Sequence, residues 1–431
     1  MRMSKELTHV HFIGIGGIGM SGLARLYLHE GVGVSGSDST ISAITQALEQ
    51  EGVEFFADQG AHNITNGIDL VVYTEAMPED HPEVVAAREQ GIETINYFEA
   101  LGRVANEYYL IAVAGTHGKT TTTAMLIDIL EEASFDPTAI VGSLRSKTGS
   151  NFRAGKSKYF IVEACEYKRD FLTLEPDVLV ITNLEHEHVD YYRDLADVQA
   201  AFKALARKVP EDGVVIAQIK DASMAPVLDG LTAPVLDYQE AIDLSLELPQ
   251  PGLHNQLNAA AARKAAEYLD VEKSHIDAAL KHFAGTKRRF EFKGEVNNAP
   301  VFDDYAHHPT EIEATIAGVR AKYPDTNVIA VFQPHTFSRL KELEANFITA
   351  LSKADRVLMI PVYAAREADD GSISSEMIIE ELKNQGVAAE HFHTHAAAAQ
   401  AIKESATKDD VVVVMGAGDV TKVSEYLTNG I

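Results

Sequence analysis

The segment Gly115-Thr-His-Gly-Lys-Thr120 has the residue types and spacing that bind a polyphosphate. An apolar run, Leu110 to Ala114, predicts a buried strand before it, and a hydroxyl-rich run predicts a helix from Lys119. Backbone N–H groups at such a helix N-terminus bind phosphate oxygens, the lysine adds positive charge, and the Thr120 hydroxyl can bind Mg²⁺. The usual pattern has a glycine at the position of Val113. The segment is therefore a shortened phosphate loop, for which an ordinary glycine turn is the alternative.

Other predicted strands end in side chains that can bind a metal ion. One ends at Glu163, and another ends at Asn183, shortly before His186 and His188. Ligands of an open α/β sheet bind at the carboxyl ends of its strands, so Thr120, Glu163 and His188 can meet around Mg²⁺-ATP. Two alternatives stay open: a zinc site of both histidines with an acid, or solvated charges on a loop.

A second glycine pattern, Gly14-x-Gly16-x-x-Gly19, follows a strand-like run that begins at His9. A second predicted strand ends at Asp38, about 20 residues further on. This spacing is the dinucleotide-binding fingerprint, with the acid on a ribose hydroxyl. Glycines and a helix dipole accept any diphosphate, so a UDP-sugar fits the pattern as well as NAD does.

Polar side chains also gather in the rest of the chain. His254, Asn255 and Asn258 lie at the start of an alanine-rich helix, where they can cap the helix or contact a base edge. The segment 285–291 holds the densest group of basic residues. Predicted strands further on are followed by Asp304, His307 and His308, by Arg339, and by Tyr363 and Arg366.

The elements that must position these residues alternate between strand and helix, which predicts an α/β fold. A length of 431 residues suggests about three domains. We expect boundaries that give domains 1–106, 107–286 and 287–431: a Rossmann-like domain, a central phosphate-loop ATPase domain and a second Rossmann-like domain. No low-complexity segment, coiled-coil heptad or solenoid repeat is evident.

Composition narrows the function classes. The formal net charge of −27 argues against binding to nucleic acid or to an anionic membrane surface. A single cysteine, Cys165, excludes an intrachain disulfide and suits a reducing compartment. With neither a signal-peptide pattern nor an apolar run of 18 residues, we expect a cytoplasmic protein. We also expect a monomer or a weak homodimer.

Taken in order, eight motifs resemble the Mur ligase family over nearly the whole chain. They are the Gly14–Met20 turn with Gly36-Ser-Asp38, Gly115–Thr120, Glu163-Ala-Cys-Glu166, Thr182-Asn183 followed by His188, His254-Asn-x-x-Asn258, Lys287-Arg-Arg-Phe290, Asp303-Asp-Tyr-Ala-His-His-Pro309 and Tyr363-Ala-Ala-Arg-Glu367. Single motifs are weak, but the ordered set is specific.

The resemblance implies roles for the candidate residues. The UDP-sugar would contact Gly14, Gly16, Gly17, Gly19, Met20, Ser37, Asp38 and Thr74. ATP would contact Gly115, Thr116, His117, Gly118, Lys119, Thr120, Thr121, His254, Asn255, Asn258, Arg289 and Asp304. Mg²⁺ would be held by Thr120, Glu163 and His188, and the amino-acid side would include His307, His308, Arg339, Tyr363 and Arg366. The residues expected to be catalytic are Lys119, His188, Arg289 and His308.

The implied activity is ATP-dependent joining of L-alanine to UDP-N-acetylmuramate through an acyl phosphate, a step of peptidoglycan precursor synthesis. Either His188 or His308 would accept the amine proton. A ligase that recycles a murein tripeptide is the nearest alternative. The Tyr167-Lys-Arg-Asp170 stretch and the N-terminal glycine pattern favour the alanine-adding activity over it. A nicotinamide dehydrogenase would leave the phosphate loop unexplained. Two residues depart from the family pattern: Glu187 stands where Asp is expected, and Thr336 replaces a more usual Arg.

Overall fold

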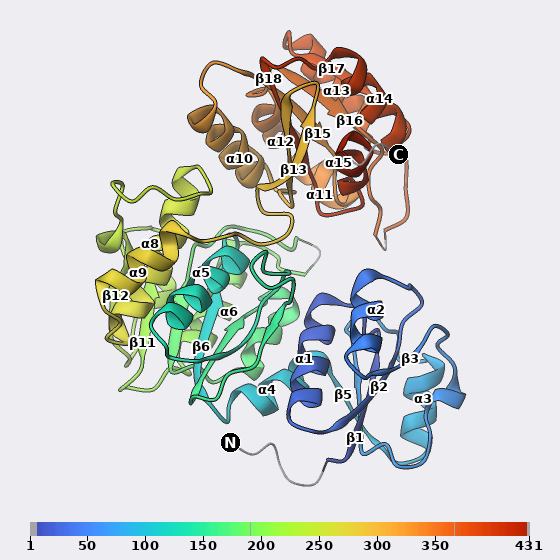
Figure 1. Cartoon of the computed structure of the whole chain (residues 1–431), viewed down its shortest axis with the longest axis vertical. Coiled ribbons are helices and arrows are strands. Elements are labelled where there is room, and N and C mark those ends of the chain that lie inside the picture. Colours follow the sequence, from blue (N-terminus) through green and yellow to red (C-terminus); the bar gives the residue numbers. More distant parts are fainter. Residues whose placement is uncertain (1–6, 190, 366, 429–431) are drawn as a thin grey trace. The chain divides into compact units, whose positions relative to one another are not determined.

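The computed structural model describes residues 7–189, 191–365 and 367–428 (Figure 1). Within them the strands form three sheets, and helices alternate with the strands along the chain. The predicted α/β class is confirmed. The chain divides into two compact units: Met1–His186, Asp194–Ile242 and Asn258–Leu280 form the first, and Glu187–Arg193, Asp243–Leu257 and Lys281–Ile431 form the second. The domain boundaries at 106 and 286 stay a prediction.

The first sheet is entirely parallel, with strand order β3-β2-β1-β4-β5. Its strands are β1 (His9–Ile13), β2 (Gly33–Ser37), β3 (Glu54–Phe56), β4 (Leu70–Tyr73) and β5 (Glu93–Asn96). The connecting helices are α1 (Ile18–His29), α2 (Ala43–Gln50), α3 (Pro82–Glu89) and α4 (Tyr97–Ala105), with a 3-10 turn at Ala61–Asn63. The sheet changes direction of growth at β1, so the turn after β1 lies where a doubly wound sheet binds its ligand.

The second sheet has the order β12-β11-β10-β6-β9-β7-β8 and is parallel except at the β7/β8 edge. Its strands are β6 (Tyr109–Ala114), β7 (Thr138–Ile140), β8 (Phe152–Arg153), β9 (Tyr159–Glu163), β10 (Val178–Ile181), β11 (Val214–Ala217) and β12 (Val235–Asp237). The helices are α5 (Lys119–Glu132), α6 (Leu195–Ala206), α7 (Ala225–Leu228), α8 (Leu253–Tyr268) and α9 (Lys273–Lys281), with 3-10 segments at Tyr167–Thr173 and Tyr238–Ala241. Because β6 pairs with both β9 and β10, the carboxyl ends of these three strands are neighbours.

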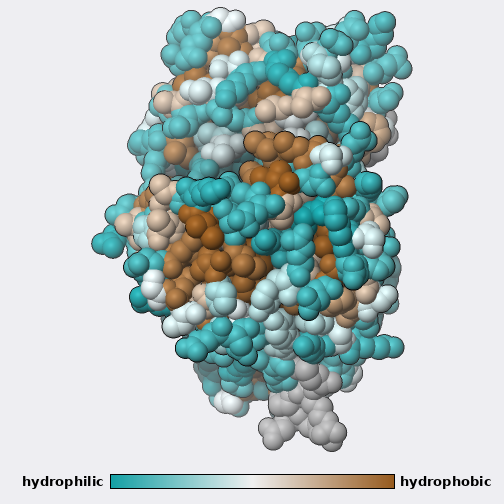
Figure 2. Space-filling view, turned by 90° about the vertical axis from the view of Figure 1, so that its left-hand side faces the viewer, coloured by the Kyte–Doolittle hydropathy of each residue, from teal (hydrophilic) through white to brown (hydrophobic). Residues whose placement is uncertain are grey.

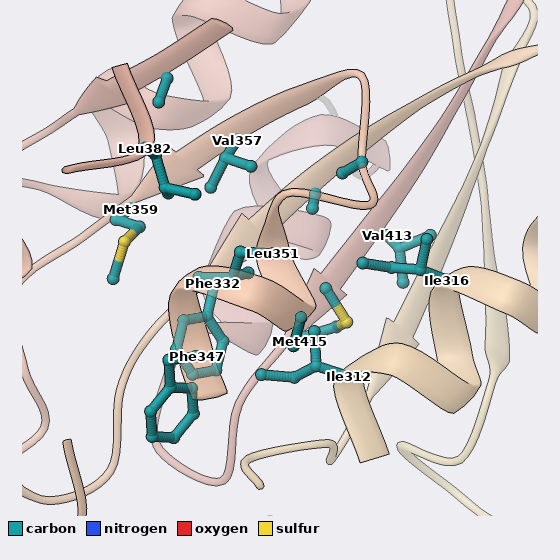
Figure 3. Close-up of a cluster of buried hydrophobic side chains, with 14 of the residues drawn as sticks. Ile312, Ile316, Phe332, Phe347, Leu351, Val357, Met359, Leu382, Val413 and Met415 are labelled. Atoms are coloured by element: carbon teal, nitrogen blue, oxygen red, sulfur yellow. The ribbon is translucent and has the colours of Figure 1, made fainter. Parts of the chain in front are cut away.

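The third sheet has the order β13-β14-β18-β15-β16-β17, with β13 antiparallel to β14 at one edge. Its strands are β13 (Glu291–Val296), β14 (Ala299–Asp304), β15 (Asn327–Phe332), β16 (Arg356–Met359), β17 (Ala388–His391) and β18 (Asp410–Met415). The helices are α10 (Pro309–Lys322), α11 (Phe337–Glu342), α12 (Glu344–Leu351), α13 (Ser375–Asn384), α14 (His395–Ser405) and α15 (Thr421–Thr428). Residues such as Phe332, Phe347 and Met415 form a buried core on one face of this sheet (Figure 3).

The apolar run predicted as a strand at Leu110 to Ala114 is β6, which is buried along most of its length. The edge strands β3, β8, β13 and β17 were missed because they are short or carry polar residues, so their patterns resemble loops.

Hydrophilic residues cover most of the face seen in Figure 2, and hydrophobic residues gather there in a few areas. Of the helices in the described ranges, none is both long and apolar enough to span a bilayer.

Candidate active site

The predicted phosphate loop joins β6 to α5. Gly115 has φ +129° and Gly118 has φ +82°, values that L side chains rarely adopt. A Cβ at Gly115 would overlap the Thr182 hydroxyl, and a Cβ at Gly118 would overlap the Asn258 amide. Both positions therefore require glycine, for conformation and for space. Gly118 is also the N-cap of α5, so the free N–H groups of that helix start beside the loop.

The end of β10 holds the loop in place. Thr116 N donates to Asn183 O at 3.0 Å, and His117 N donates to Asn183 Oδ1 at 2.9 Å. The His117 carbonyl accepts from Thr182 Oγ1 at 2.6 Å and from Asn183 Nδ2 at 3.0 Å. No binding role was predicted for Thr182 or Asn183, although both follow an apolar strand of the same sheet. Their position at a strand end was the available signal.

Lys119 is the charged residue of the loop. Its Nζ lies 2.9 Å from Glu166 Oε2 and donates to Thr116 O at 3.0 Å and to the Gly115 carbonyl. Burial lowers the pKa of Lys119, but the carboxylate of Glu166 and the other acidic groups nearby outweigh it and raise the pKa overall. Lys119 is therefore a permanent cation at the loop. It is held against a carboxylate that is 2% exposed.

Thr120 and Glu163 meet as predicted. Thr120 Oγ1 donates to Glu163 Oε1 at 3.0 Å, and Gly142 N donates to Glu163 Oε2 at 2.9 Å. A hydroxyl and a carboxylate side by side at the start of a phosphate-binding helix are the oxygen donors that Mg²⁺ prefers. These two residues fit a magnesium ion that also binds nucleotide oxygens. Thr121 is buried in the same first turn of α5.

The second predicted nucleotide site is the turn between β1 and α1. Gly14 N and Ile15 N donate to Ser37 O at 2.8 and 3.0 Å, so the turn is attached to the end of β2. Gly16 N donates to Asp38 Oδ2 at 2.9 Å. Asp38 thus lies against the glycine turn, and its predicted contact with a ribose hydroxyl or a UDP-sugar stays a prediction. Gly17 is the N-cap of α1, and Met20 is buried in its first turn.

Close packing explains why two of these positions have no room for a side chain. A Cβ at Gly14 would lie 2.6 Å from Thr74 Cγ2, and one at Gly19 would lie 2.7 Å from the ring of Tyr97. Thr74 therefore borders the turn, and its predicted contact with the UDP-sugar stays a prediction. Tyr97, the first residue of α4, was missed because nothing in its local pattern separates it from a core aromatic residue.

Ser37 has a structural partner beneath the turn. Its hydroxyl donates to Glu83 Oε2 at 2.6 Å, and Asn63 Nδ2 donates to Glu83 Oε1 at 2.6 Å. Burial raises the pKa of Glu83, but bonds to His11, Ser37 and Asn63 outweigh it and lower the pKa overall. The carboxylate is ionised and fixes the Ser37 side chain.

In the second unit, Asp304 at the end of β14 and the residues that follow it form a compact polar group. Asp304 accepts from Phe290 N and Ala306 N, both at 2.8 Å, and burial raises the pKa of Asp304 to about 6. His308 is the N-cap of α10, where its Nδ1 accepts from Thr310 N at 3.4 Å. That contact favours the neutral tautomer with a proton on Nε2. Whether His308 or His188 accepts the amine proton stays a prediction.

Glu311 links the histidines and the basic segment. Its Oε2 accepts from His307 N at 3.0 Å, and Arg289 Nη1 lies 3.7 Å from its Oε1. Burial lowers the pKa of His254 and of His307 to about 4, which the carboxylate of Glu311 opposes. Both imidazoles are therefore neutral near pH 7, and Arg289 supplies the positive charge.

Because of these histidines, we expect the free energy of unfolding to fall in acid. A histidine with a pKa near 4 in the folded chain and 6.5 when unfolded stabilises the fold above pH 6.5 and loses that contribution as the pH falls toward 4. For His307 the loss is at most about 3 kcal/mol. We expect His307→Gln to lose less free energy of unfolding than the wild type between pH 6.5 and 4, measured by urea titration. His62→Gln, an exposed residue, is the control. An equal loss in His307→Gln and the wild type would contradict the assignment.

Arg339 and Glu187 form a buried ion pair in the second unit. Arg339 Nη2 lies 2.7 Å from Glu187 Oε1, and His188 Nε2 lies 3.4 Å from Glu187 Oε2. Arg339 also donates to the His335 carbonyl, and the His335 ring stacks on Tyr363 with centroids 5.6 Å apart. The longer Glu187, found where Asp was expected, reaches both Arg339 and His188. Arg366 lies outside the described residues.

The start of α8 supports the capping alternative for one residue. Asn255 is 5% exposed and its Nδ2 donates to Pro251 O at 2.8 Å, within the turn that precedes the helix. The Asn258 side chain borders Gly118. The remaining roles assigned to the candidate residues stay predictions.

The chain is similar to known proteins over nearly its whole length. Family models match the chain at residues 9–109 (Mur ligase family, catalytic domain), 113–238 (Mur ligase middle domain) and 288–418 (Mur ligase, glutamate ligase domain). The UDP-N-acetylmuramate–L-alanine ligase of Lachnospira eligens is 41% identical, with 97% of each chain covered. Among solved structures, a UDP-N-acetylmuramate–alanine ligase from Thermotoga maritima matches with TM-score 0.82 and 28% identity, and a murein peptide ligase from Psychrobacter arcticus with TM-score 0.73 and 26% identity. Both matches cover 98% of each chain.

Proposed function

The chain belongs to the Mur ligase family, and from this premise we propose that it joins L-alanine to UDP-N-acetylmuramate using ATP. The observation that carries the proposal is 41% identity to a UDP-N-acetylmuramate–L-alanine ligase over 97% of both chains. The two nucleotide-binding turns support it, since the reaction needs one nucleotide-linked sugar and one nucleoside triphosphate.

The chemistry explains the need for ATP. A carboxylate does not acylate an amine, because its charge repels the nucleophile and it has no good leaving group. Transfer of the γ-phosphoryl group to the sugar's lactyl carboxylate gives an acyl phosphate, which the alanine amine attacks. The tetrahedral intermediate then expels phosphate and leaves the amide. The protein's part is to align the reactants and to stabilise negative charge.

The chain has groups for both tasks. Lys119 and the N–H groups at the start of α5 bind the triphosphate, and Arg289 supplies a second cation. Asp38 and the Gly14–Gly19 turn hold the UDP part. His308, with a proton on Nε2, donates a hydrogen bond to a substrate oxygen, so the amine proton passes to another acceptor, for which His188 is our candidate.

We propose Mg²⁺ as the metal cofactor, held by Thr120, Glu163 and His188. When bound, it would neutralise charge on the phosphate oxygens during transfer. Thr120 and Glu163 present their oxygens together. We further propose a cytoplasmic location, where ATP is available.

A murein tripeptide is the second candidate for the amine substrate, because the Psychrobacter arcticus ligase shares the fold. Phosphate release from Mg²⁺-ATP separates the candidates. We expect release that requires both UDP-N-acetylmuramate and L-alanine. Release with the tripeptide but not alanine would favour recycling, and no release with either acceptor would overturn the ligase proposal.

A further inference from the structure

A cluster of metal-binding side chains lies in the second unit, away from the residues discussed above in sequence. It consists of Glu376 in the first turn of α13, His391 at the end of β17, and His393 two residues later. One potential ligand atom from each residue lies within 4.8 Å of the others. Two imidazoles and one carboxylate are a ligand set that zinc sites use, with water in the remaining position.

The distances suit a small cation. His391 Nδ1 lies 3.2 Å from Glu376 Oε1, close to the roughly 3.3 Å between two ligands of a tetrahedral ion with bonds near 2.0 Å. The rings of His391 and His393 are 4.9 Å apart at an interplanar angle of 81°, so they do not block one another. Glu376 and His393 are exposed, so their side chains can move inward by the remaining ångström or so.

A second observation distinguishes His391 from a surface histidine. Its side chain is only 9% exposed, and its buried Nε2 has no hydrogen-bond partner among the residues that the structure describes. The nitrogen that faces Glu376 is Nδ1, so an ion there leaves Nε2 unpaired, and what burial contributes is a ring held in one position. The nearby His395 differs, because its Nε2 contacts Asp419 Oδ1 at 3.0 Å.

We propose that Glu376, His391 and His393 bind one divalent transition-metal ion of the zinc class. The site is built on β17, the edge strand of the third sheet, and on α13. An ion there ties the edge strand to the helix that precedes it in the chain. Its nitrogen ligands would select zinc over Mg²⁺, which prefers oxygen.

The test is a calorimetric titration of the metal-free full chain with Zn²⁺. Nucleotide is left out, and an excess of Mg²⁺ is present so that Mg²⁺ occupies the oxygen-ligand sites. We expect one Zn²⁺ per chain. His393→Ala and Glu376→Gln should each weaken Zn²⁺ binding at least about tenfold. His62→Ala, which removes an exposed histidine of the first unit, should leave binding unchanged.

Co²⁺ gives a second measurement, since four-coordinate Co²⁺ bound to imidazole absorbs visible light strongly. The wild type should show this absorption and His393→Ala should lose it, while circular dichroism confirms that the variant is folded. Absence of Zn²⁺ uptake by the wild type, or equal affinity in His393→Ala and the wild type, would overturn the proposal. Failure here with alanine-dependent ligase activity intact would leave the proposed function standing.

Discussion

Replacing Lys119 with methionine is expected to lower kcat for alanine-dependent phosphate release on the order of 10³-fold. Lys119 is the permanent cation of the phosphate loop and lies at the start of α5, where we propose that the triphosphate binds. Methionine keeps the length and apolar stem of the side chain and removes the charge. The measurement is kcat with ATP, UDP-N-acetylmuramate and L-alanine all saturating.

The same substitution also affects the fold. Glu166, which is 2% exposed, loses the cation at 2.9 Å, and breaking a buried pair costs about 3 kcal/mol. The double variant Lys119→Met/Glu166→Gln should recover most of that free energy of unfolding and none of the activity. Activity of Lys119→Met within tenfold of the wild type would show that the lysine does not act on the phosphates. Recovery of activity in the double variant would show that its role is structural.

Gly115→Ala should reduce activity at least about 100-fold and lower the free energy of unfolding by several kcal/mol. The new methyl group would overlap the Thr182 hydroxyl, and the backbone φ of +129° is open to glycine alone. Relief requires the loop to move away from the end of β10, which breaks the bonds that orient His117. Steady-state kinetics and urea unfolding measure the two effects.

Gly230→Ala is the matched control. Gly230 also has positive φ, +70°, but a Cβ there meets no atom within 4 Å. It should cost only about 1 kcal/mol of backbone strain and leave kcat unchanged. If Gly115→Ala behaved like Gly230→Ala, the fit between the loop and β10 would not be needed for activity.

Local signals were enough to identify the two nucleotide-binding turns. The glycine spacing, the apolar run before each turn and the helix after it all depend on neighbouring residues. β6 therefore occupies the predicted run and starts one residue earlier, and β2 and β9 end within one residue of the predicted ends at Asp38 and Glu163. The ordered motifs indicated the Mur ligase family, because eight motifs in a fixed order are far more specific than any single motif.

The contacts across each sheet were decided by tertiary structure. Three contacts depend on strand order, which local patterns do not contain. Glu166 pairs with Lys119, the end of β10 holds the phosphate loop, and the ring of Tyr97 leaves room only for glycine at position 19. The same holds for the lowered pKa of His307, which follows from burial among residues distant in sequence.

The cluster of Glu376, His391 and His393 shows the difference most clearly. The sequence alone places Glu376 15 residues before His391 with no recognisable ligand spacing, and β17 was not predicted at all. The parallel crossover from α13 to the edge strand brings the carboxylate and imidazoles together. Sequence determined which chemical groups the chain carries and the local turns that bind nucleotides. Only the packing of helices on sheets decided which distant groups meet, because burial and sheet pairing depend on the whole chain.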